Sequence, residues 1–135
     1  MAGEIIIDAT NATLGRLASY ATKQALQGKD VIILNSEKAI ITGKRKNVIN
    51  NYLEKTQKKG SIQRGPTFRR EPERILKRTI RGMIPDHRRG RGKEVFKKIL
   101  CFRGVPEKYK EAKTIKAGKE KRTAFITIEE LAKLI

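Results

Sequence analysis

The chain has 135 residues, with 32 lysine and arginine residues against 14 acidic ones and a formal net charge of +18 at pH 7. This length suits one hydrophobic core, and a 38% share of hydrophobic residues excludes a disordered polyelectrolyte. A single cysteine excludes an internal disulfide and a cysteine-rich zinc site. No apolar run reaches the roughly 18 residues of a membrane span. We expect one cytoplasmic domain over 1–135, with a polyanionic partner and with no metal, cofactor, small-molecule substrate or membrane.

The first part of the sequence predicts a strand, a helix and a second strand. Short apolar runs rich in β-branched residues occupy 4–8 and 30–35, as in buried strands. Between them, leucine and alanine residues recur at helical spacing from Leu14 to Leu26, and Gly28 stands where helices often end. A helix that connects two strands of one sheet in this way makes them parallel, so this segment predicts an α/β fold.

The middle of the chain predicts two helices joined by a basic loop. Residues 56–70 combine glycine, proline and basic residues and predict a mobile loop. The second helix begins at Pro72, which suits the first helical turn, and stops before Pro85. A helix over 42–55 is indicated by four residues that share one face: Val48, Ile49, Tyr52 and Leu53.

The helix after Pro72 separates apolar and basic residues onto opposite sides. The side predicted to face the core holds Ile75, Leu76, Thr79, Ile80 and Met83. The other side, called here the cationic stripe, holds Arg74, Lys77, Arg78 and Arg81. Like charges one helical turn apart cost stability unless an anion lies between them. Phosphate groups are the expected anion.

A glycine-rich basic loop is expected over 86–92, "DHRRGRG". Glycine lets the backbone approach a phosphate closely, so arginines between glycines can follow an irregular polyanion. Val95 and Phe96 are expected on a short helix that leads into an apolar strand over 99–103. Cys101 is then a small core residue of that strand.

The C-terminal part predicts an arm and a final helix. Residues 107–122 are polar and lysine-rich and predict an extended or mobile arm. Thr127 and Glu130 stand at the spacing of a capping box, in front of an apolar run. Residues 127–135 therefore predict a terminal helix that docks on the core.

Motifs for enzymatic chemistry are incomplete. The turn after the first strand has Gly15 as its only glycine, so the dinucleotide fingerprint is missing, and Arg45 stands where a P-loop needs serine or threonine. His87 is the only histidine and cannot form a pair of metal-binding histidines. Asp8 ends a predicted strand, a catalytic position in open α/β sheets, but a carboxylate beside a helix start is also a common cap.

The basic residues concentrate in the middle of the chain. Residues 61–93 hold eleven basic and three acidic side chains, whereas 1–30 hold three of each. Most of the basic residues in 61–93 are arginines, whose guanidinium groups match phosphate geometry and stack on bases. A cationic helix face beside a basic loop on a folded core indicates a nucleic-acid-binding protein. Charge spread over helix and loops, without a DNA-binding motif, favours RNA read by shape and backbone.

Four segments, in this order and covering most of the chain, closely resemble the family of large-subunit ribosomal protein thirteen (universal L13). They are "DATNATLGRLAS" (8–19), "VIILNSEKAIITGKRK" (31–46), "FRREPERILKRTIRGMIP" (68–85) and "GRGKEVFKKILCFRGVP" (90–106). The arginine-rich "PTFRREPERI" and the absence of a long C-terminal extension resemble the archaeal form. The resemblance implies a single α/β domain, with a central, mainly parallel sheet of about four strands and helices on both faces.

The resemblance also implies a non-enzymatic protein that binds and stabilises large-subunit rRNA during assembly and contacts neighbouring large-subunit ribosomal proteins. It therefore implies a place in the large ribosomal subunit, in the cytoplasm, and a role in translation. The residues expected to contact RNA are Lys44, Arg45, Lys46, Arg64, Arg69, Arg70, Arg74, Lys77, Arg78, Arg81, Arg88, Arg89, Arg91 and Lys93.

Two alternatives stay open from the sequence. One is a free regulatory RNA-binding protein, because some eukaryotic relatives act away from the ribosome. The other is an enzyme of RNA or nucleotide metabolism that uses Asp8 near the carboxyl edge of the sheet.

Overall fold

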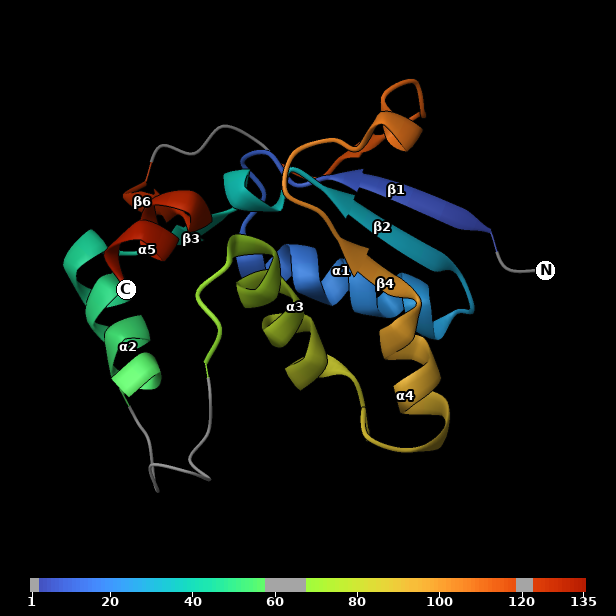
Figure 1. Cartoon of the computed structure of the whole chain (residues 1–135), viewed down its shortest axis with the longest axis horizontal. Helices are drawn as coiled ribbons and strands as arrows, with labels where there is room; N and C mark the ends of the chain where they lie inside the picture. Colours follow the sequence, from blue (N-terminus) through green and yellow to red (C-terminus); the bar gives the residue numbers. More distant parts are fainter. Residues whose placement is uncertain (1–2, 58–67, 119–122) are drawn as a thin grey trace.

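The computed structural model describes residues 3–57, 68–118 and 123–135, which form an α/β domain around a four-stranded parallel sheet of order β4-β2-β1-β5 (Figure 1). A second sheet pairs two short strands in antiparallel fashion. The elements are β1 (Glu4–Asp8), α1 (Leu14–Leu26), β2 (Asp30–Leu34), the 3₁₀ helix η1 (Ser36–Lys38), β3 (Ile40–Thr42), α2 (Arg45–Gln57), α3 (Pro72–Met83), α4 (Gly90–Lys97), β4 (Ile99–Cys101), the 3₁₀ helix η2 (Glu107–Tyr109), β5 (Ile115–Lys116), β6 (Phe125–Thr127) and α5 (Ile128–Leu134).

The predicted strand–helix–strand unit is confirmed. Strand β1 lies parallel to β2, with Ile7 opposite Ile33. Helix α1 ends as its sequence indicates, because Gly28 adopts a φ of +94° and its N–H donates to Ala25 O while the Lys29 N–H donates to Gln24 O. This pair of hydrogen bonds is a Schellman motif, which glycine favours.

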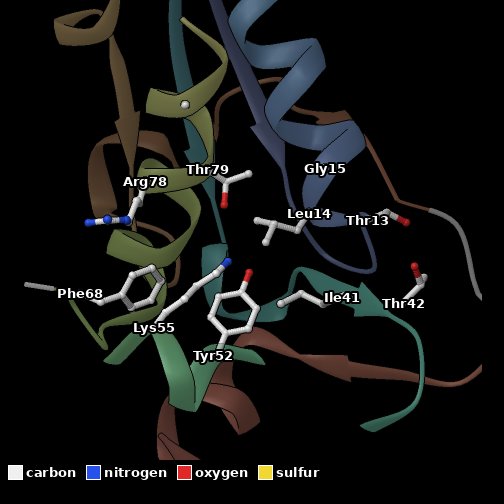
Figure 2. Close-up of a pocket in the computed structure, with 11 residues that line it drawn as sticks. Thr13, Leu14, Gly15, Ile41, Thr42, Tyr52, Lys55, Phe68, Arg78 and Thr79 are labelled. Atoms are coloured by element: carbon white, nitrogen blue, oxygen red, sulfur yellow. The ribbon is translucent and has the colours of Figure 1, made fainter. Parts of the chain in front are cut away.

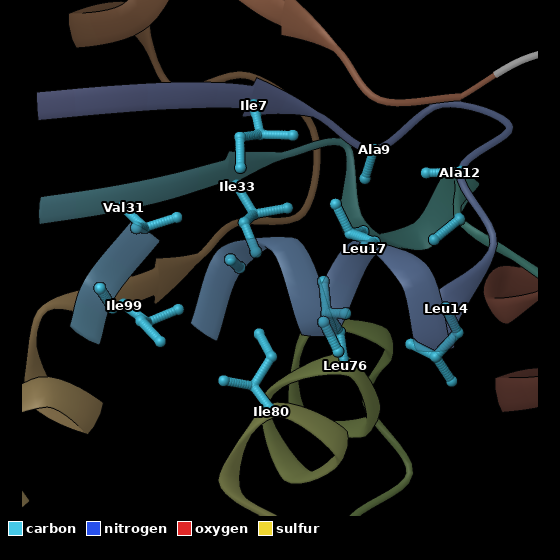
Figure 3. Close-up of a cluster of buried hydrophobic side chains, with 14 of the residues drawn as sticks. Ile7, Ala9, Ala12, Leu14, Leu17, Val31, Ile33, Leu76, Ile80 and Ile99 are labelled. Carbon is cyan, nitrogen blue, oxygen red and sulfur yellow. The ribbon is translucent and has the colours of Figure 1, made fainter. Parts of the chain in front are cut away.

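Helix α1 lies between the sheet and α3, so the core has three layers (Figure 3). Ile7 and Ile33 turn toward α1 from the sheet, and Leu76 and Ile80 reach it from α3. The buried positions of α1 include Ala18, Ala21 and Ala25, whose small side chains let both neighbouring layers approach its backbone. Leu76 and Ile80 are fully buried in this contact.

The two faces of the sheet are covered unequally. Helices α1, α3 and α4 pack on one face, whereas the segment around η2 covers the other (Figure 1). Ile32 and Leu34 turn to this second face and pack against Tyr109. Helices were expected on both faces of the sheet. Within the described residues, the only helical cover of the second face is the single 3₁₀ turn η2.

At one end of the domain, β3 and β6 pair close to α2 and α5 (Figure 1). Val48 of α2, Ile126 of β6 and Leu131 of α5 form a separate buried cluster there. The Thr127 hydroxyl accepts the Glu130 N–H at 3.2 Å, as the capping spacing predicts. Helix α5 thus forms within the stretch 127–135.

Several segments differ from the sequence-based expectations. The arm expected over 107–122 packs against the domain in its described part, because Ile115–Lys116 form β5 beside β1 and Tyr109 is buried. Residues 119–122 lie outside the described residues. Of the basic loop expected over 56–70, residues 58–67 also lie outside them. Met83, expected in the core, is 41% exposed, because it is the last residue of α3, where the chain turns away.

Candidate nucleic-acid interface

Helix α3 presents its basic side chains outward, as its periodicity predicts. Ile75, Leu76 and Ile80 are buried beneath it. On its opposite side Arg74 is exposed, and the other three members of the cationic stripe are half-buried. The half-buried positions reflect long aliphatic stems that lie along the protein surface while the charged ends reach outward.

Two members of the stripe lie over aromatic rings. The Lys77 ammonium is 4.9 Å from the ring centroid of Phe96 in α4, and the Arg78 guanidinium carbon is 4.9 Å from that of Phe68. Such cation–π contacts fix the direction of a side chain without cancelling its charge. The aromatic neighbours thus orient these two cations.

Within the part of the chain that the structure describes, few of the predicted interface cations form ion pairs with carboxylates. In the described ranges, the ion pairs are Arg45 with Glu130, Arg103 with Glu73, and Lys133 with Glu129. Glu73, the acidic residue in the first turn of α3, pairs with Arg103 at 3.1 Å. The predicted residues that are exposed and form no ion pair within the described part of the chain are Lys44, Lys46, Arg69, Arg70, Arg74, Arg88, Arg89, Arg91 and Lys93.

The segment after α3 is more ordered than the glycine-rich loop expected from its sequence. Helix α4 begins at Gly90, so Arg91 and Lys93 stand on a helix, and only Arg88 and Arg89 stand in the preceding turn. The Arg91 guanidinium donates to Leu26 O at 2.9 Å, at the end of α1.

Gly92 does not serve the role expected of it. It is buried, and a Cβ at this position would collide with the backbone carbonyls of Pro85 and Asp86. The expectation that this glycine lets the backbone approach a phosphate is therefore wrong, because the close neighbour is the protein's own chain. Gly90, with φ of +54°, adopts a left-handed conformation at the start of α4.

The predicted residues do not form a single patch. Helix α2, which follows Lys44 and carries Lys46 in its first turn, lies at one end of the domain and α4 at the other, with α3 between them (Figure 1). The Lys77–Phe96 contact connects the stripe to α4. Arg64 lies outside the described residues. The predicted residues are thus distributed over three helices along the domain, a distribution that suits an extended polyanion.

A cleft of about 710 Å³ beside the stripe was not anticipated from the sequence (Figure 2). Its lining includes Tyr52 and Lys55 of α2, Phe68, and Arg78 of α3. The rings of Tyr52 and Phe68 meet edge to face at 5.8 Å, and the Lys55 ammonium lies 4.7 Å from the Tyr52 centroid. Burial raises the pKa of Tyr52 above its ordinary value, so the phenol stays protonated. We call this the aromatic cleft.

Asp8, the catalytic alternative, has a structural role. Its Oδ1 accepts hydrogen bonds from the Thr10 N–H at 3.0 Å, the Thr10 hydroxyl at 2.7 Å and the Asn35 amide at 3.1 Å. Burial raises the pKa of Asp8, but these hydrogen bonds and the charge of Lys38 outweigh it, so the pKa lies below 3.8. This carboxylate fixes the turn after β1.

The remaining reactive side chains are also packed. His87 meets the Phe96 ring edge to face at 6.4 Å. Burial raises the pKa of the Cys101 thiol to about 12, as expected of a core residue. Among the residues that the structure describes, no three histidine, cysteine or acidic side chains gather as a metal site would require. None of the described helices is long and apolar enough to cross a membrane.

Comparison with known proteins identifies the family of this chain. The sequence pattern of the family described as "Ribosomal protein L13" matches residues 3–108. Similar proteins named "Large ribosomal subunit protein uL13" occur in Methanosarcina barkeri (45% identity over 82% of this chain and 78% of that protein), Thermoplasma volcanium (39%, 95% of each) and Methanococcus maripaludis (38%, 97% and 96%). The chain belongs to the ribosomal protein L13 family, whose members are structural ribosomal proteins and not enzymes.

Proposed function

We propose that this chain is a structural constituent of the large ribosomal subunit that binds and stabilises large-subunit rRNA, supporting subunit assembly and translation. It resides in the cytoplasm as part of that subunit and touches neighbouring ribosomal proteins. The names of its relatives support this placement, since each is called a large ribosomal subunit protein.

The observation that carries the proposal is a group of exposed arginines that form no ion pair within the described residues. Arg69, Arg70 and Arg74 are exposed and form no ion pair with the described carboxylates. Arginines crowded on one surface repel each other, and phosphate groups between them convert that repulsion into attraction. The protein thereby lowers the electrostatic cost of bringing rRNA helices together.

Binding of the full chain to a large-subunit rRNA transcript across a salt series tests this function. If about 6 to 10 phosphates are contacted, affinity falls by roughly three to five decades between 50 and 200 mM salt. A control transcript of equal length without ribosomal sequence measures the non-specific component. Affinity that hardly changes with salt, or that is equal for both transcripts, would contradict the proposal.

A further inference from the structure

The aromatic cleft is lined both by aromatic rings and by positively charged side chains. Tyr52 and Phe68 supply aromatic surface, while Lys55 and Arg78 supply positive charge (Figure 2). In Figure 2 the Lys55 ammonium and the hydroxyls of Tyr52 and Thr79 point toward the same space. The volume of about 710 Å³ lies within the roughly 300–1,000 Å³ of pockets that hold small organic ligands.

This lining restricts the chemistry of the occupant. A purely apolar group would strip water from Lys55 without replacing its hydrogen bonds, which is unfavourable. A bare inorganic anion would leave the aromatic surface of Tyr52 and Phe68 unused. A nucleotide satisfies both parts, because its base is flat and stacks on aromatic and guanidinium groups while its phosphate attracts cations.

We propose that the aromatic cleft receives one unstacked nucleotide of the RNA that the cationic stripe binds, with the base against Tyr52 and Phe68 and the adjoining phosphate near Lys55 and Arg78. This inference rests on the proposed function and adds a single-stranded contact to it. Unpaired nucleotides in loops and bulges are the part of RNA whose bases can be splayed out and read.

The cleft is continuous with the stripe. Arg78 belongs to the stripe and also lines the cleft, and its guanidinium lies over the Phe68 ring. Gly82, one turn further along α3, forms part of the same wall. A strand of RNA that follows α3 therefore passes the mouth of the cleft, where one base can leave the stack and enter.

Two glycines in the wall allow the cleft to be filled without disturbing the fold. Gly15 of α1 and Gly82 of α3 both line it, and a Cβ at either position would meet no atom within 4 Å. Neither lies in the left-handed region that favours glycine. Gly82→Leu therefore fills space in the cleft, and Gly82→Ala is the matched control that changes the helix backbone equally but adds little volume. Gly15→Leu fills the cleft from α1.

The test measures binding of the full-length wild type and these three variants to the large-subunit rRNA transcript over 50–200 mM salt, together with their thermal transitions. The inference predicts that Gly82→Leu and Gly15→Leu each bind about tenfold to hundredfold more weakly, the effect of losing one stacked base. The slope of log affinity against log salt should fall by at most about one, because only the phosphate that adjoins the displaced nucleotide leaves its cations. Gly82→Ala should bind like the wild type.

The outcomes separate this inference from the function on which it rests. Wild-type affinity for both Leu variants, with steep salt dependence retained, would overturn the cleft proposal and leave the rRNA-binding function standing. Incorporation of the same variants into large subunits is followed by sucrose-gradient sedimentation. Normal rRNA affinity combined with failure of the Leu variants to enter large subunits would also overturn the cleft proposal, and would assign the cleft to a protein neighbour. A wild type without salt-dependent rRNA binding would contradict the proposed function itself. If Gly82→Leu lowers the temperature of the thermal transition, the rRNA affinity of Gly15→Leu alone decides whether the cleft proposal holds.

Discussion

Helices α1 and α3 pack against each other, yet their surfaces have opposite character. Helix α1 is covered by the sheet on one side and α3 on the other, and six of its residues are buried, three of them alanines. Helix α3 forms the outer layer and buries Pro72, Ile75, Leu76 and Ile80, while its other side carries the cationic stripe. A helix between two layers must be small and apolar on both sides, whereas an outer helix has one side free for a partner. Position in the layering therefore separates the residues that stabilise the fold from those available for RNA.

The largest effect is expected from the buried side of α3. Leu76→Ala should lower the free energy of unfolding by about 2–5 kcal/mol, because it leaves a cavity in the α1–α3 contact. Denaturant titration measures this loss. A change below about 1 kcal/mol would show that the contact is loosely packed and that the layered description is incorrect.

Substitution by alanine should change the free energy of unfolding in opposite directions at Gly92 and at Gly82. Gly92→Ala places a methyl group against the Pro85 and Asp86 carbonyls and should cost about 1–3 kcal/mol of unfolding free energy. Gly82→Ala meets open space within a helix and should raise that free energy by up to about 1 kcal/mol. Equal thermal shifts for the two variants would contradict the assigned roles.

The exposed side should influence binding much more than folding. The double variant Arg70→Gln with Arg74→Gln should change the free energy of unfolding by less than about 0.5 kcal/mol, because both side chains are exposed. The slope of log affinity against log salt should fall by about one for each arginine. Lys133→Gln, which removes a cation already paired with Glu129, is the control and should leave that slope unchanged. A large loss of stability in the double variant would show that these arginines hold the fold together.

The smallest effect concerns Asp8, which belongs to the scaffold. Its folded-state pKa is lower than its ordinary value of 3.8, so ionised Asp8 stabilises the fold above that value. This contribution is lost as pH falls through the folded-state pKa. Asp8→Asn should therefore be less stable than the wild type at pH 7, and the difference should shrink in acid. A difference that is constant with pH would show that the charge of Asp8 does not contribute.

Local patterns predicted several elements of the core, but not the strands β3, β5 and β6. The β1–α1–β2 unit and the two sides of α3 follow from periodicities within single segments, and the cap of α5 follows from the Thr127–Glu130 spacing. Strand β5 could not be predicted in this way, because two exposed residues in a lysine-rich stretch carry no alternation. This strand forms because it pairs with β1, which is distant in the sequence.

The candidate interface also has a part that the sequence predicts and a part that it does not. The stripe is encoded in one helix and is visible in the sequence. The aromatic cleft is not, because Tyr52, Phe68 and Arg78 come from separate segments that only the fold brings together. The role of Gly92 was also beyond the sequence, since glycines beside arginines suggest a phosphate loop, whereas this one makes room for the backbone at Pro85.

Protein–RNA crosslinking within purified large ribosomal subunits, mapped to individual residues, tests the central claim most directly. The layered arrangement predicts that the crosslinked residues of this chain concentrate between Arg69 and Lys93, on the outer side of α3 and at the start of α4. Crosslinks confined to the opposite face of the sheet, around Tyr109, with none on α3, would contradict it.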